Sequence, residues 1–250
     1  MNIDRILYED KDIIVCHKPA GIATQTAKVG SPDMVSEIKG YLAGQSKAQI
    51  PYVGLIHRLD QPVEGILVFA KNKRAAANLS AQVQDFRMEK YYLAVVRLPD
   101  SGLSEEDSPQ SEIKQEDIMH EGTLTDYLYQ DKSTNTSYVT DEGKPGAKLA
   151  RLSYQIVGKQ TAIALLRIHL LTGRHHQIRV QLTNMGYSLL GDYKYADEET
   201  KALSGCLGQK QVALCAYELT FLHPASGERL NFRIQPEGEI FHKFSFIESI

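Results

Sequence analysis

Three features are absent from this sequence of 250 residues, and each absence excludes a class of protein. No stretch approaches the roughly 18 consecutive apolar residues of a membrane-spanning helix. The first 21 residues carry acids and bases among their apolar positions, whereas a secretory signal needs an uninterrupted apolar segment. The three cysteines, Cys16, Cys206 and Cys215, are odd in number and lack CxxC spacing. Their number and spacing favour reduced thiols and a cytoplasmic location.

An excess of positive charge is also missing. The chain has 28 Lys+Arg against 31 Asp+Glu, a formal net charge of −3, so total charge does not point to nucleic acid. The distribution is uneven, because basic residues gather at 58–90 and 167–179 and acids at about 99–121. A local basic face is compatible with a polyanionic partner, although ordinary solvated surfaces show the same pattern.

The apolar patterning predicts an α+β fold with a mixed, largely antiparallel β-sheet and flanking helices. A polar surface loop is expected at about 99–121, and one catalytic domain over 1–250 is the simplest organisation. Helices are expected after an N-cap at Ser31, after an N-cap at Asn72 with Phe86 on its inward face, and from about 175 to 185. Strands are expected at 6–8, 13–17, 65–70, 90–96, 122–129, 151–157, 162–170, 214–222 and 229–234.

The most informative segment is Gly54-Leu55-Ile56-His57-Arg58-Leu59-Asp60, followed by Gln61-Pro62-Val63-Glu64-Gly65 and a buried apolar run. A carboxylate on a tight loop beside a buried strand is desolvated, which raises its pKa unless a cation lies close to it. Taken alone the motif is weak, since Asp60 could cap a turn with Arg58 as its surface partner.

Two further segments add weight. The strand at 90–96 contains Lys90-Tyr91-Tyr92, although a half-buried tyrosine with a hydrated hydroxyl is common. Residues 167–179 combine three arginines and three histidines in a predicted strand, turn and helix. Arg174 is expected near the helix N-terminus, where a phosphate is also favoured, and Arg179 is placed to point back at a carboxylate.

Together these segments resemble the RluA-like family of pseudouridine synthases. The resemblance lies in His57-Arg58-Leu59-Asp60, in Lys90-x-Tyr92, and in Gly173-Arg174-x-His176-Gln177-Ile178-Arg179, in that order. Shorter matches extend it from about residue 6 to 235: Lys18-Pro19-Ala20-Gly21, Gly122-Thr123-Leu124, Gly191-Asp192-x-x-Tyr195 and Leu219-x-Phe221-x-His223-Pro224.

The resemblance implies an enzyme that isomerises uridine to pseudouridine in ribosomal or transfer RNA. Asp60 corresponds to the essential aspartate, Tyr92 to the residue beside the target uracil, and Arg179 to the partner of Asp60. His57, Arg58, Arg174 and His176 would contact RNA, with Arg58 filling the space left by the flipped uridine. No metal and no cofactor is implied, because the product is an isomer of the substrate. A monomer without a membrane association is expected.

The sequence departs from this family in two places. Many relatives have Arg/Lys-x-Thr-Ser-Gly after the aspartate, where this chain has Gln61-Pro62-Val63-Glu64-Gly65. Glu64 adds a second carboxylate four residues from Asp60, which bears on local pKa values and on RNA contacts. The chain also begins at the catalytic strands, so no separate N-terminal RNA-binding module is expected.

Three other interpretations remain open at this point. A sugar hydrolase would use Asp60 and Glu64 as paired carboxylates on opposite sides of one bond. A metal enzyme would use His169, His175 and His176, although adjacent histidines ordinarily point in different directions. An RNA-binding protein without catalysis would keep the fold and lose turnover.

Overall fold

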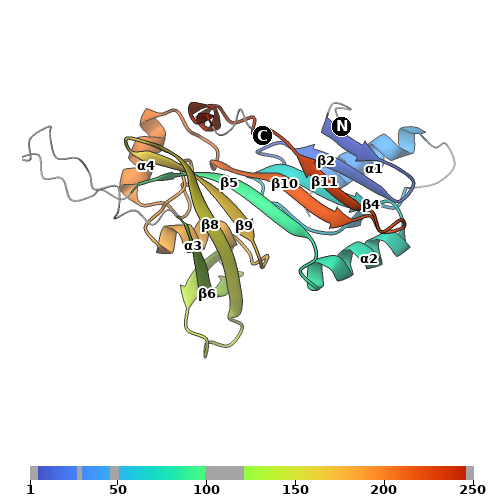
Figure 1. The fold of residues 1–250 in the computed structure, drawn as a ribbon, viewed down its shortest axis with the longest axis horizontal. Helices are drawn as coiled ribbons and strands as arrows, with labels where there is room; N and C mark the ends of the chain where they lie inside the picture. The colour runs from blue at the N-terminus through green and yellow to red at the C-terminus, as the bar shows by residue number, and fades with distance from the viewer. Residues whose placement is uncertain (1–4, 27–29, 46–50, 99–120, 246–250) are drawn as a thin grey trace, which may run out of the picture. The chain divides into compact units, whose positions relative to one another are not determined.

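The computed structural model describes residues 5–26, 30–45, 51–98 and 121–245 (Figure 1). The chain divides into two compact units. Of the described residues, the first unit contains those up to Tyr92 together with Leu214–Gly238, and the second contains those from Leu93 to Ala213 together with 239–245. Within the described residues, no helix combines the length and the apolar character needed to cross a membrane.

The first unit is built on a mixed sheet. Its strands are β1 (Ile6–Glu9), β2 (Ile13–Lys18), β3 (Gly54–Leu55), β4 (Glu64–Ala70), β10 (Leu214–Leu222) and β11 (Arg229–Arg233). They lie in the order β1-β2-β4-β10, with β11 paired to β10 and β3 paired to β4. The β4–β10 pair is parallel, and the other pairs are antiparallel. This arrangement places the loop between β3 and β4, which carries Asp60, at the beginning of the fully buried strand β4.

Two helices belong to this unit, α1 (Met34–Gln45) and α2 (Lys73–Gln84). Asn72 caps α2 as predicted, because its side chain accepts the backbone N–H of Ala75. The N-cap predicted for α1 at Ser31 is wrong. Asp33 performs that role, since its carboxylate accepts the N–H of Ser36 at 2.7 Å.

The core of this unit lies between the sheet and α2. It contains Ile13, Val15, Ile66, Val68, Ala70, Ala75, Leu79, Met88, Leu219 and Phe221. The alternate residues of β2, β4 and β10 supply most of it, as the two-residue period of a strand requires. Phe86 does not join them: its side chain is exposed and its backbone is left-handed, with φ of 56°. The left-handed turn after α2 therefore overrides the helical pattern that predicted Phe86 to face inward.

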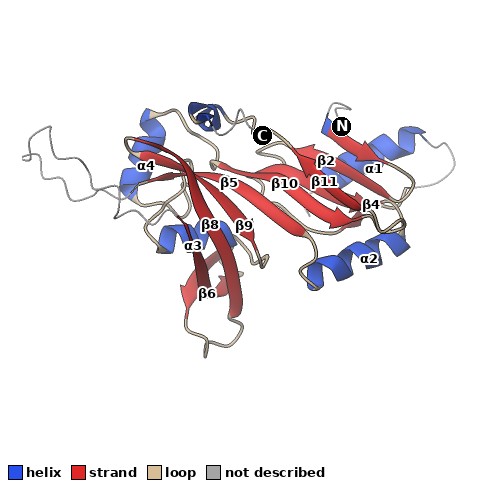
Figure 2. Cartoon of the chain, in the orientation of Figure 1, coloured by secondary structure: helices blue, strands red, loops and turns tan. Residues whose placement is uncertain are grey.

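The second unit begins within β5 (Glu89–Arg97) and contains an antiparallel sheet (Figure 2). Its strands are β6 (Glu121–Asp131), β7 (Thr136–Thr140), β8 (Lys148–Gln160) and β9 (Ile163–Leu170), in the order β9-β8-β6-β7. Its helices are α3 (Gln177–Asn184) and α4 (Glu198–Cys206). Val180 of α3 packs against Leu128 of β6 and Ala150 of β8.

The predicted fold class is confirmed, since the strands form mixed and mostly antiparallel sheets with few helices. The loop expected at about 99–121 lies outside the described residues except for Glu121, which begins β6. The single catalytic domain stays a prediction.

Candidate active site

Asp60 lies on the loop from Ile56 to Val63, which joins β3 to β4, and its side chain is half-buried. The loop is held by short contacts on both sides of the aspartate. The carbonyl of Asp60 accepts the N–H of Val63 at 3.1 Å, which closes a turn. The Thr24 hydroxyl donates to the carbonyl of Leu59 at 2.8 Å and accepts the N–H of Leu59 at 3.1 Å. These contacts fix the backbone on which Asp60 is carried.

Lys18, the last residue of β2, is fully buried beside this loop. Its ammonium donates to the carbonyls of Pro19, Ile22 and Gln61 at 2.9, 2.7 and 3.1 Å. Burial lowers the pKa of Lys18 to about 8, while the carboxylates of Asp60 and Glu64 act to raise it. Lys18 therefore both ties the loop down and places a positive charge in the field of Asp60.

Tyr92 of β5 is buried within the same unit. Burial raises the pKa of its phenol above the usual range, and Asp60 and Cys215 raise it further. The phenol is consequently protonated across the physiological pH range, so Tyr92 presents a flat ring and a hydrogen-bond donor. Burial also raises the pKa of the Cys215 thiol, which leaves the thiol an unreactive neighbour.

His57 and Arg58 lie on the same loop but face different surroundings. The Nε2 atom of His57 accepts the backbone N–H of Val68 at 3.3 Å, which continues the β3–β4 pairing by one contact. Burial, and to a smaller extent the charge of Lys90, lower the pKa of His57 to about 3, so the ring is neutral. Arg58 is exposed.

In the second unit, the segment from Leu171 to His176 is held by the buried side chain of Gln177. The Oε1 atom of Gln177 accepts the hydroxyl of Thr172 at 2.8 Å and the N–H of Arg174 at 3.0 Å, and its Nε2 donates to the carbonyl of Arg151 at 3.1 Å. Arg174 precedes α3 as predicted, and its Nε donates to the carbonyl of Leu149 at 2.8 Å.

Arg179 is buried on α3 and makes a two-pronged ion pair with Asp192. Its Nε and NH2 groups donate to the two carboxylate oxygens of Asp192 at 2.7 Å each. The guanidinium also lies over the ring of Tyr195, 4.9 Å from the centroid. The Tyr195 hydroxyl lies 2.6 Å from Nδ1 of His176, which occupies the left-handed N-cap position of α3.

Comparison with known proteins assigns this arrangement to a family. Residues 12–184 match the model of the family described as RNA pseudouridylate synthase. An RNA pseudouridine synthase of Aquifex aeolicus is 30% identical over 250 residues, which cover 97% of this chain and 72% of the relative. A ribosomal large subunit pseudouridine synthase D of Nitrosomonas europaea is 31% identical, covering 90% of this chain and 60% of the relative. The chain belongs to the RNA pseudouridylate synthase family.

Structural comparison agrees on the fold. The human RNA pseudouridylate synthase domain containing 4 superposes with a TM-score of 0.71 at 22% identity, covering 96% of this chain and 91% of that one. This chain spans 60% to 72% of the length of the two sequence relatives described above. The RluA-like resemblance drawn from the motifs is thereby confirmed at the level of family and fold.

Within this family fold, the structure brings together some of the predicted site residues. Asp60 and Tyr92 lie in the first unit and interact electrostatically. Arg174, His176 and Arg179 lie in the second unit, close to the start of α3. The pairing of Arg179 with Asp60 crosses the two units and stays a prediction. The RNA contacts of His57, Arg58, Arg174 and His176 also stay predictions.

The rival pairing of Asp60 with Glu64 as hydrolase carboxylates has little support in the geometry. The Glu64 carboxylate accepts the backbone N–H groups of Glu237 and Gly238 and faces His17. It is therefore committed to contacts inside the first unit. The expectation that His175 and His176 point in different directions is wrong, because their rings stack with centroids 3.6 Å apart.

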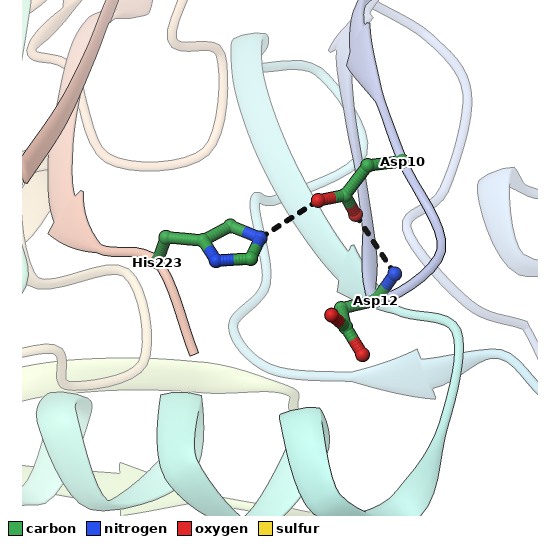
Figure 3. Close-up of side chains that lie close together, drawn as sticks. All are labelled: Asp10, Asp12 and His223. Carbon is green, nitrogen blue, oxygen red and sulfur yellow. Dashed lines mark hydrogen bonds and ion pairs between the residues drawn. The ribbon is translucent and has the colours of Figure 1, made fainter. Parts of the chain in front are cut away.

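Among the described residues, two groups of side chains lie close enough to share a metal ion. The first is Asp10, Asp12 and His223 (Figure 3). The Nδ1 atom of His223 accepts the N–H of Ser226 at 3.0 Å, so we assign the proton to Nε2, which donates to Asp10 at 2.8 Å. The atom that would bind a metal thus carries a proton, and the group is better described as a hydrogen-bonded pair joining two turns.

The second group is His17, Glu64 and Glu237, and cations already compensate its carboxylates. Arg5 lies 3.0 Å from Glu237, and Lys18 is within the field of Glu64. A divalent ion here would meet the repulsion of both cations, so the donor set does not fit a metal.

Sequence reasoning missed the roles of Lys18, Gln177 and Asp192. Each belongs to a motif that the sequence does show, Lys18-Pro19-Ala20-Gly21, His176-Gln177-Ile178-Arg179 and Gly191-Asp192. The available signal was a polar residue inside an otherwise apolar or turn-forming segment. Such a residue is buried only when it is hydrogen-bonded or paired.

Proposed function

We propose that this chain is an RNA pseudouridine synthase that converts uridines of ribosomal or transfer RNA to pseudouridine, with Asp60 as its nucleophile. The observation that carries the proposal is the half-buried Asp60, held on a clamped loop beside the protonated phenol of Tyr92 and the ammonium of Lys18. Ribosomal RNA is the first substrate to test, because several relatives are named ribosomal large subunit pseudouridine synthases.

The chemistry requires the uracil to leave the ribose, rotate and rejoin through carbon 5. A carboxylate at Asp60 serves this by attacking the sugar carbon or by assisting departure of the base, as carboxylates do at other glycosidic bonds. Because Tyr92 is protonated, it acts first as a ring against the uracil and as a hydrogen-bond donor. A role in removing the proton from carbon 5 requires that substrate binding lowers the pKa of its phenol.

The cations have separate roles in this proposal. Arg179 is the cation that keeps Asp60 ionised in this proposal, and its own pair with Asp192 holds the guanidinium in one orientation. Arg58 is exposed on the loop of Asp60 and fills the place of the flipped uridine. His57, Arg174 and His176 contact the RNA backbone or bases. A monomer in the cytoplasm, where RNA and reduced cysteines coexist, completes the proposal.

The decisive experiment is release of tritium from RNA labelled at carbon 5 of uridine. We expect wild-type protein to release tritium from unmodified ribosomal or transfer RNA, and Asp60→Asn to release it at least about a thousand-fold more slowly. Filter binding should show that Asp60→Asn retains RNA affinity.

Asp85→Asn is the matched control, because Asp85 is exposed after α2 and pairs only with Arg87 among the contacts described for it. This variant should release tritium like wild type. Tight binding without any release by wild type would contradict the catalytic proposal and favour an RNA-binding protein without turnover.

A further inference from the structure

Glu64 is an acidic residue at the head of a strand that is otherwise apolar. It is the first residue of β4 (EGILVFA), it follows Asp60 by four positions, and it is only 5% exposed. A carboxylate buried to this degree needs hydrogen bonds or a cation to offset the loss of hydration. The contacts of Glu64 therefore show which segments of the chain its carboxylate holds together.

Both carboxylate oxygens of Glu64 hold the segment that follows β11. Oε2 accepts the N–H of Glu237 at 3.1 Å, and Oε1 accepts the N–H of Gly238 at 3.4 Å. Oε2 also lies 3.8 Å from Nε2 of His17 on β2, and this nitrogen is buried and has no hydrogen-bond partner. Among the described residues, the ion-pair contact of His17 Nε2 is with Glu64.

The next residue fixes the same end of β4 by close packing. Gly65 has φ of 142°, and a Cβ atom there would lie 2.5 Å from the Cβ of Ala216 on β10. The beginning of β4 is thus fixed to β10 by the close approach at Gly65, and to β2 and the chain after β11 by the carboxylate of Glu64.

The stretch of the loop between Asp60 and Glu64 is fixed by Lys18. Its ammonium bonds the carbonyl of Gln61, and Gly21 donates its N–H to the same carbonyl at 2.8 Å. Gln61 returns a side-chain bond to the carbonyl of Gly21 at 3.0 Å. Two clamps therefore hold the chain directly after Asp60, one centred on Lys18 at Gln61 and one centred on Glu64 at the start of β4.

We infer that Glu64, together with His17, is a positioning residue for the loop that carries Asp60. This inference rests on the proposed function and adds a residue to it. Glu64 acts through the loop backbone and does not need to touch the substrate. Its loss should lower kcat more than it raises KM, because a displaced Asp60 weakens the transition state more than RNA binding.

The charge of Glu64 has a second consequence, because it helps to keep Lys18 protonated. The groups of this unit that surround the pair are His17, Cys215, Glu237, Arg5 and Asp60. Since Glu64 raises the pKa of Lys18 and burial lowers it to about 8, neutralising Glu64 should lower that pKa. Activity that needs the Lys18 ammonium should then decline at a lower pH.

The test compares Glu64→Gln with Glu218→Gln. Glu218 on β10 is also 5% exposed, and its carboxylate bonds Asn231 and Arg233 of β11. We expect Glu64→Gln to lower kcat about ten-fold with KM within about two-fold. We also expect the alkaline limb of its pH profile to move down by about half a unit. Glu218→Gln should keep both the wild-type kcat and the wild-type profile.

Amide hydrogen exchange gives a measure that does not depend on turnover. Exchange at Leu59 and Val63, whose N–H groups bond Thr24 and Asp60, should be faster in Glu64→Gln than in Glu218→Gln. His17→Gln is the second variant and should show the same direction, should Glu64→Gln fold poorly. Equal kinetics, pH profiles and loop exchange in the two glutamine variants would overturn the inference. If the wild-type protein itself shows no turnover, that result counts against the proposed function. The comparison of amide hydrogen exchange between the variants would still decide the role of Glu64.

Discussion

The carboxylate of Asp60 and the guanidinium of Arg179 are held in place by different kinds of contact. Asp60 is half-buried on a loop, and other residues hold the backbone of that loop. Arg179 is buried on a helix, and its own side chain is locked by two bonds of 2.7 Å to Asp192. The first unit fixes the backbone around its charge, and the second unit fixes the charged group itself.

This difference predicts how substitutions at each site affect the protein. Several hydrogen bonds of modest energy share the stabilisation of the loop backbone, so losing one of them shifts the loop without unfolding the unit. A buried ion pair depends on one partner, because removing that partner weakens the compensation of a charge in a medium of low polarity. Variants of the second site should therefore cost more stability than variants of the first.

The largest expected effect comes from breaking the buried pair. Asp192→Asn removes the charge that receives both of these bonds from Arg179, at a place where neither side chain is more than 5% exposed. We expect a loss of about 3 to 5 kcal/mol in the free energy of unfolding, measured by urea denaturation. The exposed pair of Arg87 with Asp85 is the matched control, and Asp85→Asn should change stability little. A small loss in Asp192→Asn would show that Arg179 is compensated elsewhere and would remove the contrast between the two sites.

A smaller effect is expected when the ammonium clamp is removed. Lys18→Met preserves the shape of the side chain and removes the ammonium that donates to the carbonyls of Pro19, Ile22 and Gln61. We expect a loss of about 1 to 3 kcal/mol of stability together with faster amide exchange at Gly21, whose N–H bonds Gln61. Lys201→Met on α4, which breaks only the pair with Glu198, should leave both unchanged. Unchanged exchange at Gly21 in Lys18→Met would mean that the loop does not depend on the ammonium.

The sequence predicted the apolar parts of both units better than the polar parts. The strands at 65–70 and 214–222 were located to within one residue, because continuous apolar runs identify buried strands. β7 (TSYVT) and α4 (EETKALSGC) were missed, since neither has an apolar periodicity. In α4 the buried positions are Thr200 and Ser204, and the Ser204 hydroxyl accepts the N–H of Gly191 at 2.9 Å. Burial through hydrogen-bonded hydroxyls leaves no hydrophobic pattern to detect.

In the candidate site, too, the polar contacts could not be predicted from the sequence. The positions of Asp60, Tyr92 and Arg179 followed from motifs, but the partners that hold them did not. Asp192 meets Arg179 only because the chain turns back after α3, and a single sequence does not specify that turn. Glu64 was recognised as a departure from the family pattern, yet its contact with Glu237 joins residues 173 positions apart. Contacts of that range depend on the folded topology.

The smallest expected effect concerns the pH dependence of the clamped loop. His57 has a folded-state pKa of about 3 against an ordinary value of 6.5, because burial disfavours the imidazolium. A lowered pKa means that the stability gained from neutral His57 is fully present above pH 6.5 and is lost as the pH falls toward 3. His57→Gln keeps an acceptor for the N–H of Val68 and cannot titrate, so its stability should fall less steeply over this range.

Urea denaturation at several pH values between 7.5 and 4 measures this slope. His242→Gln is the control, because His242 is exposed in the 3₁₀ helix at Glu239–Lys243. It should follow the wild-type curve. Parallel curves for wild type and His57→Gln would show that His57 is hydrated enough to titrate normally. The first site would then have one polar residue open to water, and the loop of Asp60 would depend on Lys18, Thr24 and Glu64 for its position.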